Sequence, residues 1–248
     1  MKRSRHKPDG TPFVCQERGE VSMHFGMGAV QSRMRVGKPD VLVLDYTRAM
    51  MSFLLFNPAP RDILMLGLGG GSLAKYCHAH LPNTRFTAVE INPEVIAMRG
   101  LFSIPPDDDR LRIACADGAA WVPAHPDSCD VLMLDGFGPE GLPPALSSQD
   151  FYDACARALQ PGGVLVANIW AGPVVRDAAL GRLRHSFDSG VVTLPAEEGE
   201  NLIAFACRDA AMPDPDTLHA RARELEAAHP IGLDLSAQRL SAALASPA

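Results

Sequence analysis

The fold is decided by the stretch Leu64-Met65-Leu66-Gly67-Leu68-Gly69-Gly70-Gly71-Ser72-Leu73. It consists of a short apolar run, a glycine-rich turn and the start of a segment with helical character. Glycines allow the backbone of such a turn to take φ > 0, and they leave room for a ligand to approach the N-terminus of the helix. Tight packing also requires glycines, so the turn becomes informative only through its surroundings. It predicts a strand–turn–helix unit.

Apolar runs continue to alternate with helical stretches downstream of this unit. The runs are apolar throughout, which is typical of parallel strands covered by helices on both faces. The predicted strands are Ile63–Leu66, Arg85–Glu90, Leu111–Cys115, Val131–Asp135 and Gly163–Asn168. The predicted helices between and after them are Ser72–Leu81, Pro93–Leu101, Ala119–Val122, Gln149–Leu159 and Val174–Arg184.

Two further strand-like runs, Gly190–Leu194 and Leu202–Cys207, lie close together and predict an antiparallel edge. We therefore expect an α/β, Rossmann-like, doubly wound fold with a mostly parallel seven-stranded sheet and an antiparallel edge strand. The flanking segments predict a short N-terminal β-hairpin region (Val21–Val36 and Val41–Tyr46), a helix (Thr47–Phe56), a charged helix (Pro215–Ala228) and a loose C-terminus. The expected divisions are a disordered tail (1–12), a small β region with a helix (13–58), the Rossmann-like domain (59–210) and a C-terminal helix and tail (211–248).

The charge balance excludes a general nucleic-acid binder. The chain has 248 residues and a formal net charge of −6, with 29 acidic against 23 basic residues, so it offers no broad basic surface to a polyanion. No apolar run approaches the ~18 residues needed to span a bilayer, and no signal-peptide core follows the basic start. We expect no membrane association and a cytoplasmic location.

The cysteines and histidines are not arranged as a metal site. The six cysteines form no C-x-x-C pair, and most of them lie in apolar stretches, so we expect reduced thiols with neither disulfides nor zinc. The eight histidines are scattered along the chain, and we expect no metal.

Three acidic residues stand at the ends of successive predicted strands. Glu90 ends the second strand, about 20 residues after the last glycine, the offset at which an acid accepts hydrogen bonds from ribose hydroxyls. Asp117 follows the third strand and Asp135 ends the fourth. Either aspartate alone could be a helix cap or a turn former. Because the carboxyl ends of adjacent parallel strands open into one crevice, the three together predict a ligand site.

The motifs as a series resemble the spermidine synthase (polyamine aminopropyltransferase) family. The resemblance extends from about Val30 to Trp170. It rests on the glycine turn, Val89-Glu90-Ile91-Asn92-Pro93-Glu94-Val95-Ile96, Asp117-Gly118, Asp130–Pro139, Phe151-Tyr152 and Leu159-Gln160-Pro161-Gly162-Gly163. It implies a class I S-adenosylmethionine-dependent methyltransferase fold and transfer of an aminopropyl group from decarboxylated S-adenosylmethionine to a small-molecule amine. It also leaves a homodimer open.

The resemblance further implies roles for individual residues. The turn glycines Gly67, Gly69 and Gly71 would approach the co-substrate, Glu90 would bind its ribose, and Asp117 with Gly118 would hold the adenine. Asp135 would be the catalytic aspartate that receives the proton of the attacking amine. Gln31 matches the glutamine of a Tyr-Gln motif, which implies contact with co-substrate or acceptor, and Tyr46 matches the tyrosine of a Tyr-His-Glu motif, which implies contact with the acceptor.

Three positions depart from the family's motifs. Ser72 stands where the family has an aspartate for the amino group of the co-substrate, and Gly138 stands where it has a second carboxylate for the diamine. Thr47-Arg48 replaces His-Glu after the tyrosine. Burying a doubly charged diamine against fewer carboxylates is costly, so we expect weak activity on putrescine and better activity on an acceptor with one charge.

The departures leave other functions open. Methyl transfer from S-adenosylmethionine itself is the main alternative, because loss of the acid at position 72 weakens the bias against a co-substrate that keeps its carboxylate. A catalytically silent nucleoside-binding protein would need Glu90 and Asp117 but no acceptor residues. A nicotinamide-dependent oxidoreductase would use the glycine turn and Glu90, but it would leave Asp135 without a role.

Overall fold

The computed structural model describes residues 11–25, 30–136, 143–188, 190–198 and 200–245. Its strands are β1 (Pro12–Glu17), β2 (Glu20–Phe25), β3 (Val30–Arg35), β4 (Asp62–Leu66), β5 (Arg85–Glu90), β6 (Leu111–Cys115), β7 (Cys129–Leu134), β8 (Leu159–Ile169), β9 (Val192–Pro195) and β10 (Leu202–Cys207). Its helices are α1 (Asp45–Met50), η1 (Met51–Leu55), α2 (Ser72–His80), α3 (Pro93–Ala97), α4 (Gly118–Ala124), η2 (Pro144–Leu146), α5 (Gln149–Ala158), α6 (Pro173–Ser186), α7 (Pro215–Leu225) and α8 (Leu233–Ala245). Most of the predicted tail (residues 1–10) and Gly138 lie outside the described ranges.

The larger sheet has the strand order β6-β5-β4-β7-β8-β10-β9 within the described residues. The five strands from β6 to β8 run parallel, whereas β10 is antiparallel to both β8 and β9. The predicted mostly parallel seven-stranded sheet is therefore confirmed. The antiparallel strand is β10, which lies one position inside the edge, with β9 outermost.

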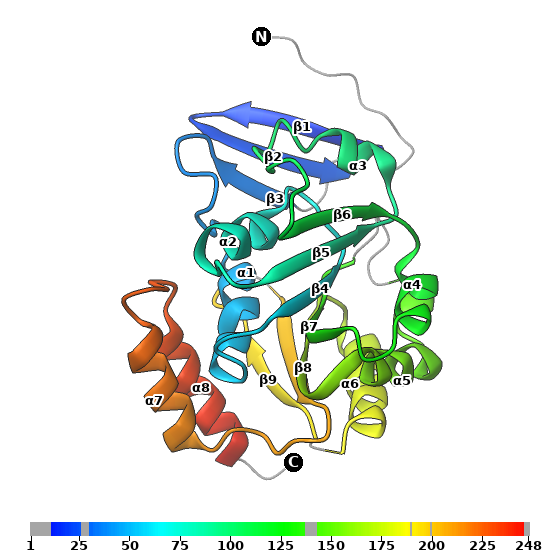
Figure 1. Ribbon diagram of the computed structural model, residues 1–248, viewed down its shortest axis with the longest axis vertical. Coiled ribbons are helices and arrows are strands. Elements are labelled where there is room, and N and C mark those ends of the chain that lie inside the picture. Colours follow the sequence, from blue (N-terminus) through cyan, green and yellow to red (C-terminus); the bar gives the residue numbers. More distant parts are fainter. Residues whose placement is uncertain (1–10, 26–29, 137–142, 189, 199, 246–248) are drawn as a thin grey trace.

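Alternate residues of each strand pack into two separate cores. In β4, Ile63 and Met65 face the core formed with η1, α2, α7 and α8, whereas Leu64 and Leu66 face the core formed with α4, α5 and α6. Both faces of the sheet are thus covered, which explains why its strands are apolar throughout. Figure 1 shows α7 and α8 side by side on one side of the sheet and α4, α5 and α6 on the other.

The N-terminal region forms a separate antiparallel sheet, β1-β2-β3 (Figure 1). The predicted hairpin corresponds to β2 and β3, and β1 adds a third strand. The expectation of β structure at Val41–Tyr46 is wrong, because no strand forms there and α1 already begins at Asp45. The predicted helix Thr47–Phe56 is divided between α1 and the 3₁₀ helix η1, whose five residues are all buried.

The C-terminal segment is more ordered than the sequence suggested. We expected loose residues after α7, but residues 233–245 form α8, which buries Leu233, Ala237 and Leu240. These three residues are spaced at helical intervals and join the core under α7 and η1. Leu235 of the same helix is exposed, so the apolar residues are not confined to the buried face and the amphipathic pattern is weak in the sequence.

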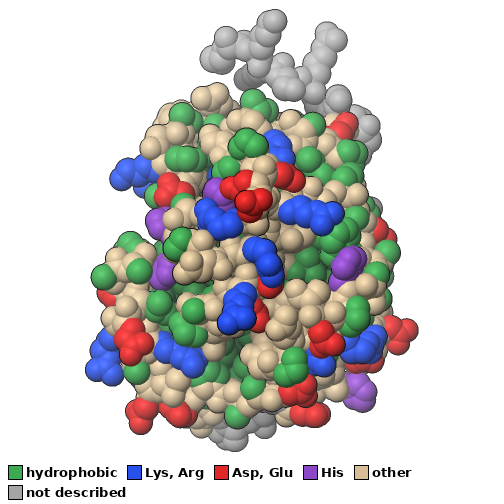
Figure 2. Space-filling view, viewed as in Figure 1, with side chains coloured by type: hydrophobic (Ala, Val, Ile, Leu, Met, Phe, Trp, Pro, Cys, Tyr) green, Lys and Arg blue, Asp and Glu red, His purple; other side chains and the backbone are tan. Residues whose placement is uncertain are grey.

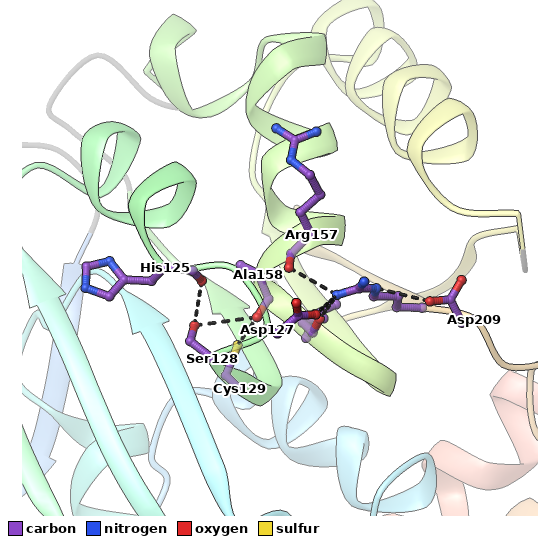
Figure 3. Close-up of polar contacts among 9 residues, drawn as sticks. His125, Asp127, Ser128, Cys129, Arg157, Ala158 and Asp209 are labelled. Carbon is purple, nitrogen blue, oxygen red and sulfur yellow. Dashed lines mark hydrogen bonds and ion pairs between the residues drawn. The ribbon is translucent and has the colours of Figure 1, made fainter.

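The amino-terminal edge of the sheet is fixed by Arg208, directly after β10. Its Nη1 donates to the carbonyl oxygens of Arg157 (3.1 Å) and Leu159 and to Oδ1 of Asp127 (2.6 Å). Figure 3 shows these contacts beside the C-terminal end of α5. Nearby, the hydroxyl of Ser128 donates a hydrogen bond to the carbonyl of His125. Carbonyl groups at a helix end lack partners within the helix, so Arg208 has a structural role on the edge opposite the strand ends that were predicted to form a site.

The surface carries charges of both signs, and most of the cysteines are buried. Figure 2 shows Lys and Arg side chains interspersed with Asp and Glu side chains on the face it presents. None of the helices in the described part is long and apolar enough to span a membrane. All six cysteines are free thiols, and four of them are buried: Cys77, Cys129, Cys155 and Cys207.

The chain segments that follow β4 and β7 stay in close contact just beyond the carboxyl ends of the two strands. Gly67 has a φ of +90°, and a Cβ built on it would lie 2.4 Å from the backbone oxygen of Asp135. The amide of Asp135 donates to the carbonyl of Leu66 (3.0 Å), so the two segments remain hydrogen-bonded past the last strand residues. Only glycine fits at position 67, and this is what brings the glycine turn against Asp135.

We therefore expect Gly67→Ala to lower the free energy of unfolding by more than about 2 kcal/mol, because alanine would carry an unfavourable positive φ and displace the Asp135 backbone. Gly181→Ala in α6 is the control. A Cβ there meets nothing within 4 Å, and alanine in a helix interior should stabilise by up to about 1 kcal/mol. Urea denaturation measures both, and equal stabilities for the two variants would contradict the close approach.

Candidate active site

The glycine turn between β4 and α2 packs against other parts of the chain on one side and faces the cavity described below on the other. Gly69 and Gly71 have φ values of +51° and +64°, which favour glycine. A Cβ on Gly70 would meet Ser32 Oγ at 2.5 Å, and one on Gly71 would meet Ile104 at 2.6 Å. Ile104 fills the space beside Gly71, which does not line the cavity described below, whereas Gly67 and Gly69 do.

Glu90 connects the end of β5 to the glycine turn. It is buried, and its Oε2 accepts the amide of Leu68 while its Oε1 accepts the amide of Asn92, both at 2.9 Å. Two backbone donors therefore hold the carboxylate in one orientation. An ionised carboxylate has about four acceptor sites, so this geometry leaves acceptor capacity for hydroxyl groups in the cavity.

Asp117 is both a helix cap and a residue of the cavity, the two roles that the sequence left open. Its Oδ1 accepts the amide of Ala119 at 2.9 Å and so caps α4. It also lines the same cavity as Glu90. The next residue, Gly118, lies so close to Leu66 that a Cβ on it would be 2.9 Å from a methyl group of that leucine. The glycine thus lets α4 begin directly against β4.

Asp135 lies at the centre of a hydrogen-bonded chain. Asn168 Nδ2 donates to its Oδ1 (2.8 Å), and the hydroxyl of Tyr46 donates to its Oδ2 (3.3 Å). Asn201 Nδ2 donates in turn to Oδ1 of Asn168 (2.9 Å). These bonds orient the Asp135 carboxylate from three elements that are distant in sequence: α1, β8 and the segment before β10.

The environment of Asp135 suits a proton acceptor. Burial raises the pKa of Asp135 to about 6, and the hydrogen bonds from Asn168 and Tyr46 partly offset this rise because they favour the ionised form. The pKa of Tyr46 lies well above its usual value, first because of burial and then because of the Asp135 charge. Tyr46 therefore remains protonated and can donate to the carboxylate throughout the neutral range.

These residues surround one cavity of about 580 Å³ at the carboxyl edge of the parallel strands. The residues predicted from the sequence that line it are Gln31, Tyr46, Gly67, Gly69, Glu90, Asp117, Gly118 and Asp135. Gln31 reaches the cavity from β3 of the small sheet, and Tyr46 from α1. A volume of this size is typical of small-molecule sites.

Several polar lining residues were missed by the sequence analysis. They are Asp45, Asn168, Glu198, Glu200 and Asn201. Asn168 ends a predicted strand, so the strand-end rule could have found it. Glu198 and Glu200 belong to the turn between two predicted neighbouring strands, and only the antiparallel register places that turn at the cavity.

The ionisable side chains that line the cavity are all acidic or tyrosyl within the described residues. The acids are Asp45, Glu90, Asp117, Asp135, Glu198 and Glu200, and no Lys, Arg or His stands among the described lining residues. Nor do the described residues contain a group of three metal-binding side chains. Such a cavity attracts cations and repels phosphates and carboxylates.

Comparison with known proteins agrees with this geometry. The family described as "Spermine/spermidine synthase domain" matches residues 44–175, which hold most of the cavity residues. The polyamine aminopropyltransferase of Chromobacterium violaceum is 40% identical over 229 residues, covering 91% of this chain and 88% of the relative.

Solved structures share the fold. The spermidine synthase of Thermotoga maritima superposes with a TM-score of 0.65 at 19% identity, covering 95% of this chain and 84% of the other. Human methyltransferase-like protein 13, solved with SAH, gives a TM-score of 0.68 at 27% identity and covers 74% of this chain and 91% of the other. The extent of the sequence match, added to the strand-end acids around one cavity, shows that the chain belongs to the spermine/spermidine synthase family.

Proposed function

We propose that the chain transfers an aminopropyl group from decarboxylated S-adenosylmethionine to an amine. The observation that carries this proposal is the acid-lined cavity with no basic side chain among its described residues. Both substrates of this reaction are cations, since one carries a sulfonium and a primary ammonium and the other carries at least one ammonium. Opposite charges within a partly enclosed cavity attract more strongly than they do in bulk water.

The same charge distribution weighs against the alternatives. A nicotinamide dinucleotide brings a pyrophosphate, and S-adenosylmethionine itself brings a carboxylate. Neither anion meets a Lys or Arg among the described lining residues. The likeness to a methyltransferase-like protein solved with SAH makes methyl transfer the second candidate. Loss of the family's aspartate at Ser72 also favours it, but the acids elsewhere in the cavity oppose binding of a carboxylate.

The co-substrate is assigned to the side of the cavity near β4, β5 and β6. Glu90 is assigned to the ribose, because its fixed carboxylate retains acceptor capacity. Asp117 and Gly118 are assigned to the adenine. Gly67 and Gly69 line this side of the cavity, so a ligand can approach the backbone of the turn.

Asp135 is assigned as the catalytic base. The sulfonium supplies a good leaving group, so the protein's main tasks are to align the amine and to remove its proton. The amine nitrogen forms the new bond to the propyl carbon as the carbon–sulfur bond breaks, and the electron pair of that bond remains on sulfur. Asp135 accepts the proton from nitrogen while Asn168 and Tyr46 hold the carboxylate in place.

The six free thiols fit a reducing compartment. We place the enzyme in the cytoplasm on this basis.

The function is tested by incubating the purified protein with decarboxylated S-adenosylmethionine and a panel of amines, and by mass spectrometry of the products. We expect amines that carry one added aminopropyl group, together with methylthioadenosine. A parallel incubation with S-adenosylmethionine should give no methylated amine. Methylated products without aminopropylated ones would replace this proposal with the methyltransferase alternative.

Asp135→Asn should lower turnover by roughly 10²–10⁴-fold, because it keeps the shape of the side chain but removes the proton acceptor. Affinity for methylthioadenosine, measured by calorimetry, should change little, since the residues assigned to the nucleoside are untouched. Near-normal turnover of a folded variant would show that Asp135 only closes the turn after β7.

The acid limb of the pH–rate profile should follow Asp135. Since its pKa is about 6, kcat/KM should fall as pH drops below about 6, where the carboxylate becomes protonated. Asn168→Ala and Tyr46→Phe each remove a hydrogen bond that favours the ionised form, so both should move this limb to higher pH, Asn168→Ala by more. A limb that stays in place in both variants would assign the titration to another group.

A further inference from the structure

A second cavity, of about 240 Å³, adjoins the active-site cavity. It is lined by α1, by the end of β9 with the two residues that follow, and by α8 with the loop before it. Asp45 is the one residue that lines both cavities within the described chain. None of the described residues assigned above to the nucleoside or to catalysis lines the second cavity. The two cavities are therefore neighbours that differ in their side chains.

Two arginine side chains with unused donors line this second cavity. Arg48, on α1, donates from Nη1 to the carbonyl oxygens of Leu42 (3.1 Å) and Val43 (3.3 Å), which leaves its other guanidinium nitrogens available. Arg239, on α8, is half-buried and makes no hydrogen bond or ion pair with the described residues. Because a guanidinium carries five N–H donors, most of the donors of this pair remain available to an acceptor group.

The two acids of the lining do not neutralise these arginines. Asp45 is buried, and its Oδ2 accepts the backbone amide of Glu198. Glu197 is exposed, so water solvates its charge. Among the described residues no ion pair joins Arg48 or Arg239 to either acid. The cavity therefore offers unpaired cationic donors, in contrast to the acid-lined active site.

The rest of the lining favours a ligand that has an apolar part. Ala49 and Leu194 are buried, whereas Leu235 lines the same cavity with 45% of its surface exposed. An apolar group that covered Leu235 would remove this surface from water. The first turn of α8 also lines the cavity, and amides in the first turn of a helix lack partners within the helix and attract anions. The volume lies below the range of about 300–1,000 Å³ usual for ligand sites, so the ligand is small.

We propose that this second cavity binds a small organic acid. Its carboxylate accepts hydrogen bonds from Arg48 and Arg239, and its short apolar chain lies against Leu194 and Leu235. The assignment goes beyond the proposed aminopropyl transfer and does not depend on it. The chain thus holds two neighbouring cavities with opposite preferences, one for cations and one for an anion, with Asp45 in the wall of both.

The test is a calorimetric titration with hexanoate, which joins a carboxylate to a short chain. Hexanamide supplies the same chain without the charge, and acetate supplies the charge without the chain. We expect hexanoate to bind the parent, and hexanamide to bind about tenfold more weakly or worse, since charge-assisted hydrogen bonds are the stronger ones. Acetate should also bind more weakly than hexanoate. Saturating methylthioadenosine should leave hexanoate binding unchanged, because the nucleoside is assigned to the other cavity.

Four variants locate the bound acid, with melting temperatures measured to verify folding. Arg239→Gln should weaken hexanoate binding by about tenfold or more. Arg48→Lys should weaken it too, because lysine keeps the charge but loses the two-pronged geometry. Glu197→Gln removes an exposed like charge and should strengthen binding by up to about fivefold. Arg184→Gln is the control, since it removes an exposed arginine from α6, on the other side of the sheet, and should change nothing.

The assignment would be overturned by a parent that does not bind hexanoate, or by one that binds hexanamide equally well. Equal affinities in Arg239→Gln and Arg184→Gln would also exclude it. Displacement of hexanoate by methylthioadenosine would place the acid in the active-site cavity instead. None of these measurements needs turnover, so a failure of the proposed function and a failure of this assignment are read separately.

Discussion

The approach of Gly67 to the backbone of Asp135 is the constraint on which the arrangement of the site depends. At this point two parallel strands have just ended, yet their extensions stay in contact because position 67 has no side chain. The contact joins the turn assigned to the co-substrate with the residue assigned as base. The proposed reaction joins two substrates through one carbon–nitrogen bond, so the glycine turn and Asp135 must lie close together. The contact between their backbones sets this spacing.

The charge of the lining residues determines which ligands the cavity can bind. Three of the six acids in the described lining of the cavity follow different parallel strands, and each is held locally: Glu90 by backbone amides, Asp117 by the amide that it caps, and Asp135 by Asn168 and Tyr46. Grouping carboxylates without basic partners destabilises the free protein through repulsion and desolvation. The raised pKa of Asp135 reflects the desolvation part of that cost, because burial is what raises it. Cationic substrates relieve the repulsion when they bind.

Much of the fold could be predicted because the signals are local. The strands Arg85–Glu90 and Leu111–Cys115 and the acid that ends the first of them follow from short stretches of sequence. The role of Gly71 in contacting Ile104 could not be predicted, since Ile104 approaches from a loop distant in sequence. Helix α8 was missed because Leu235, which is exposed, interrupts the apolar pattern of the buried residues Leu233, Ala237 and Leu240. Glu198 and Glu200 were missed because their position depends on the direction in which β10 pairs.

The placement of these acids on a hairpin turn has an evolutionary consequence. Ala196 and Asn201 close the turn with one backbone hydrogen bond, and the described residues between them, Glu197, Glu198 and Glu200, belong to no strand or helix. Both sheet cores and the hydrogen bonds of Arg208 lie elsewhere, so the turn can change its length and charge while the rest of the fold persists. The lining of the cavity is modular in such an architecture: its hairpin side can vary by the exchange of a few residues, while Glu90, Asp117 and Asp135 keep their places at the strand ends.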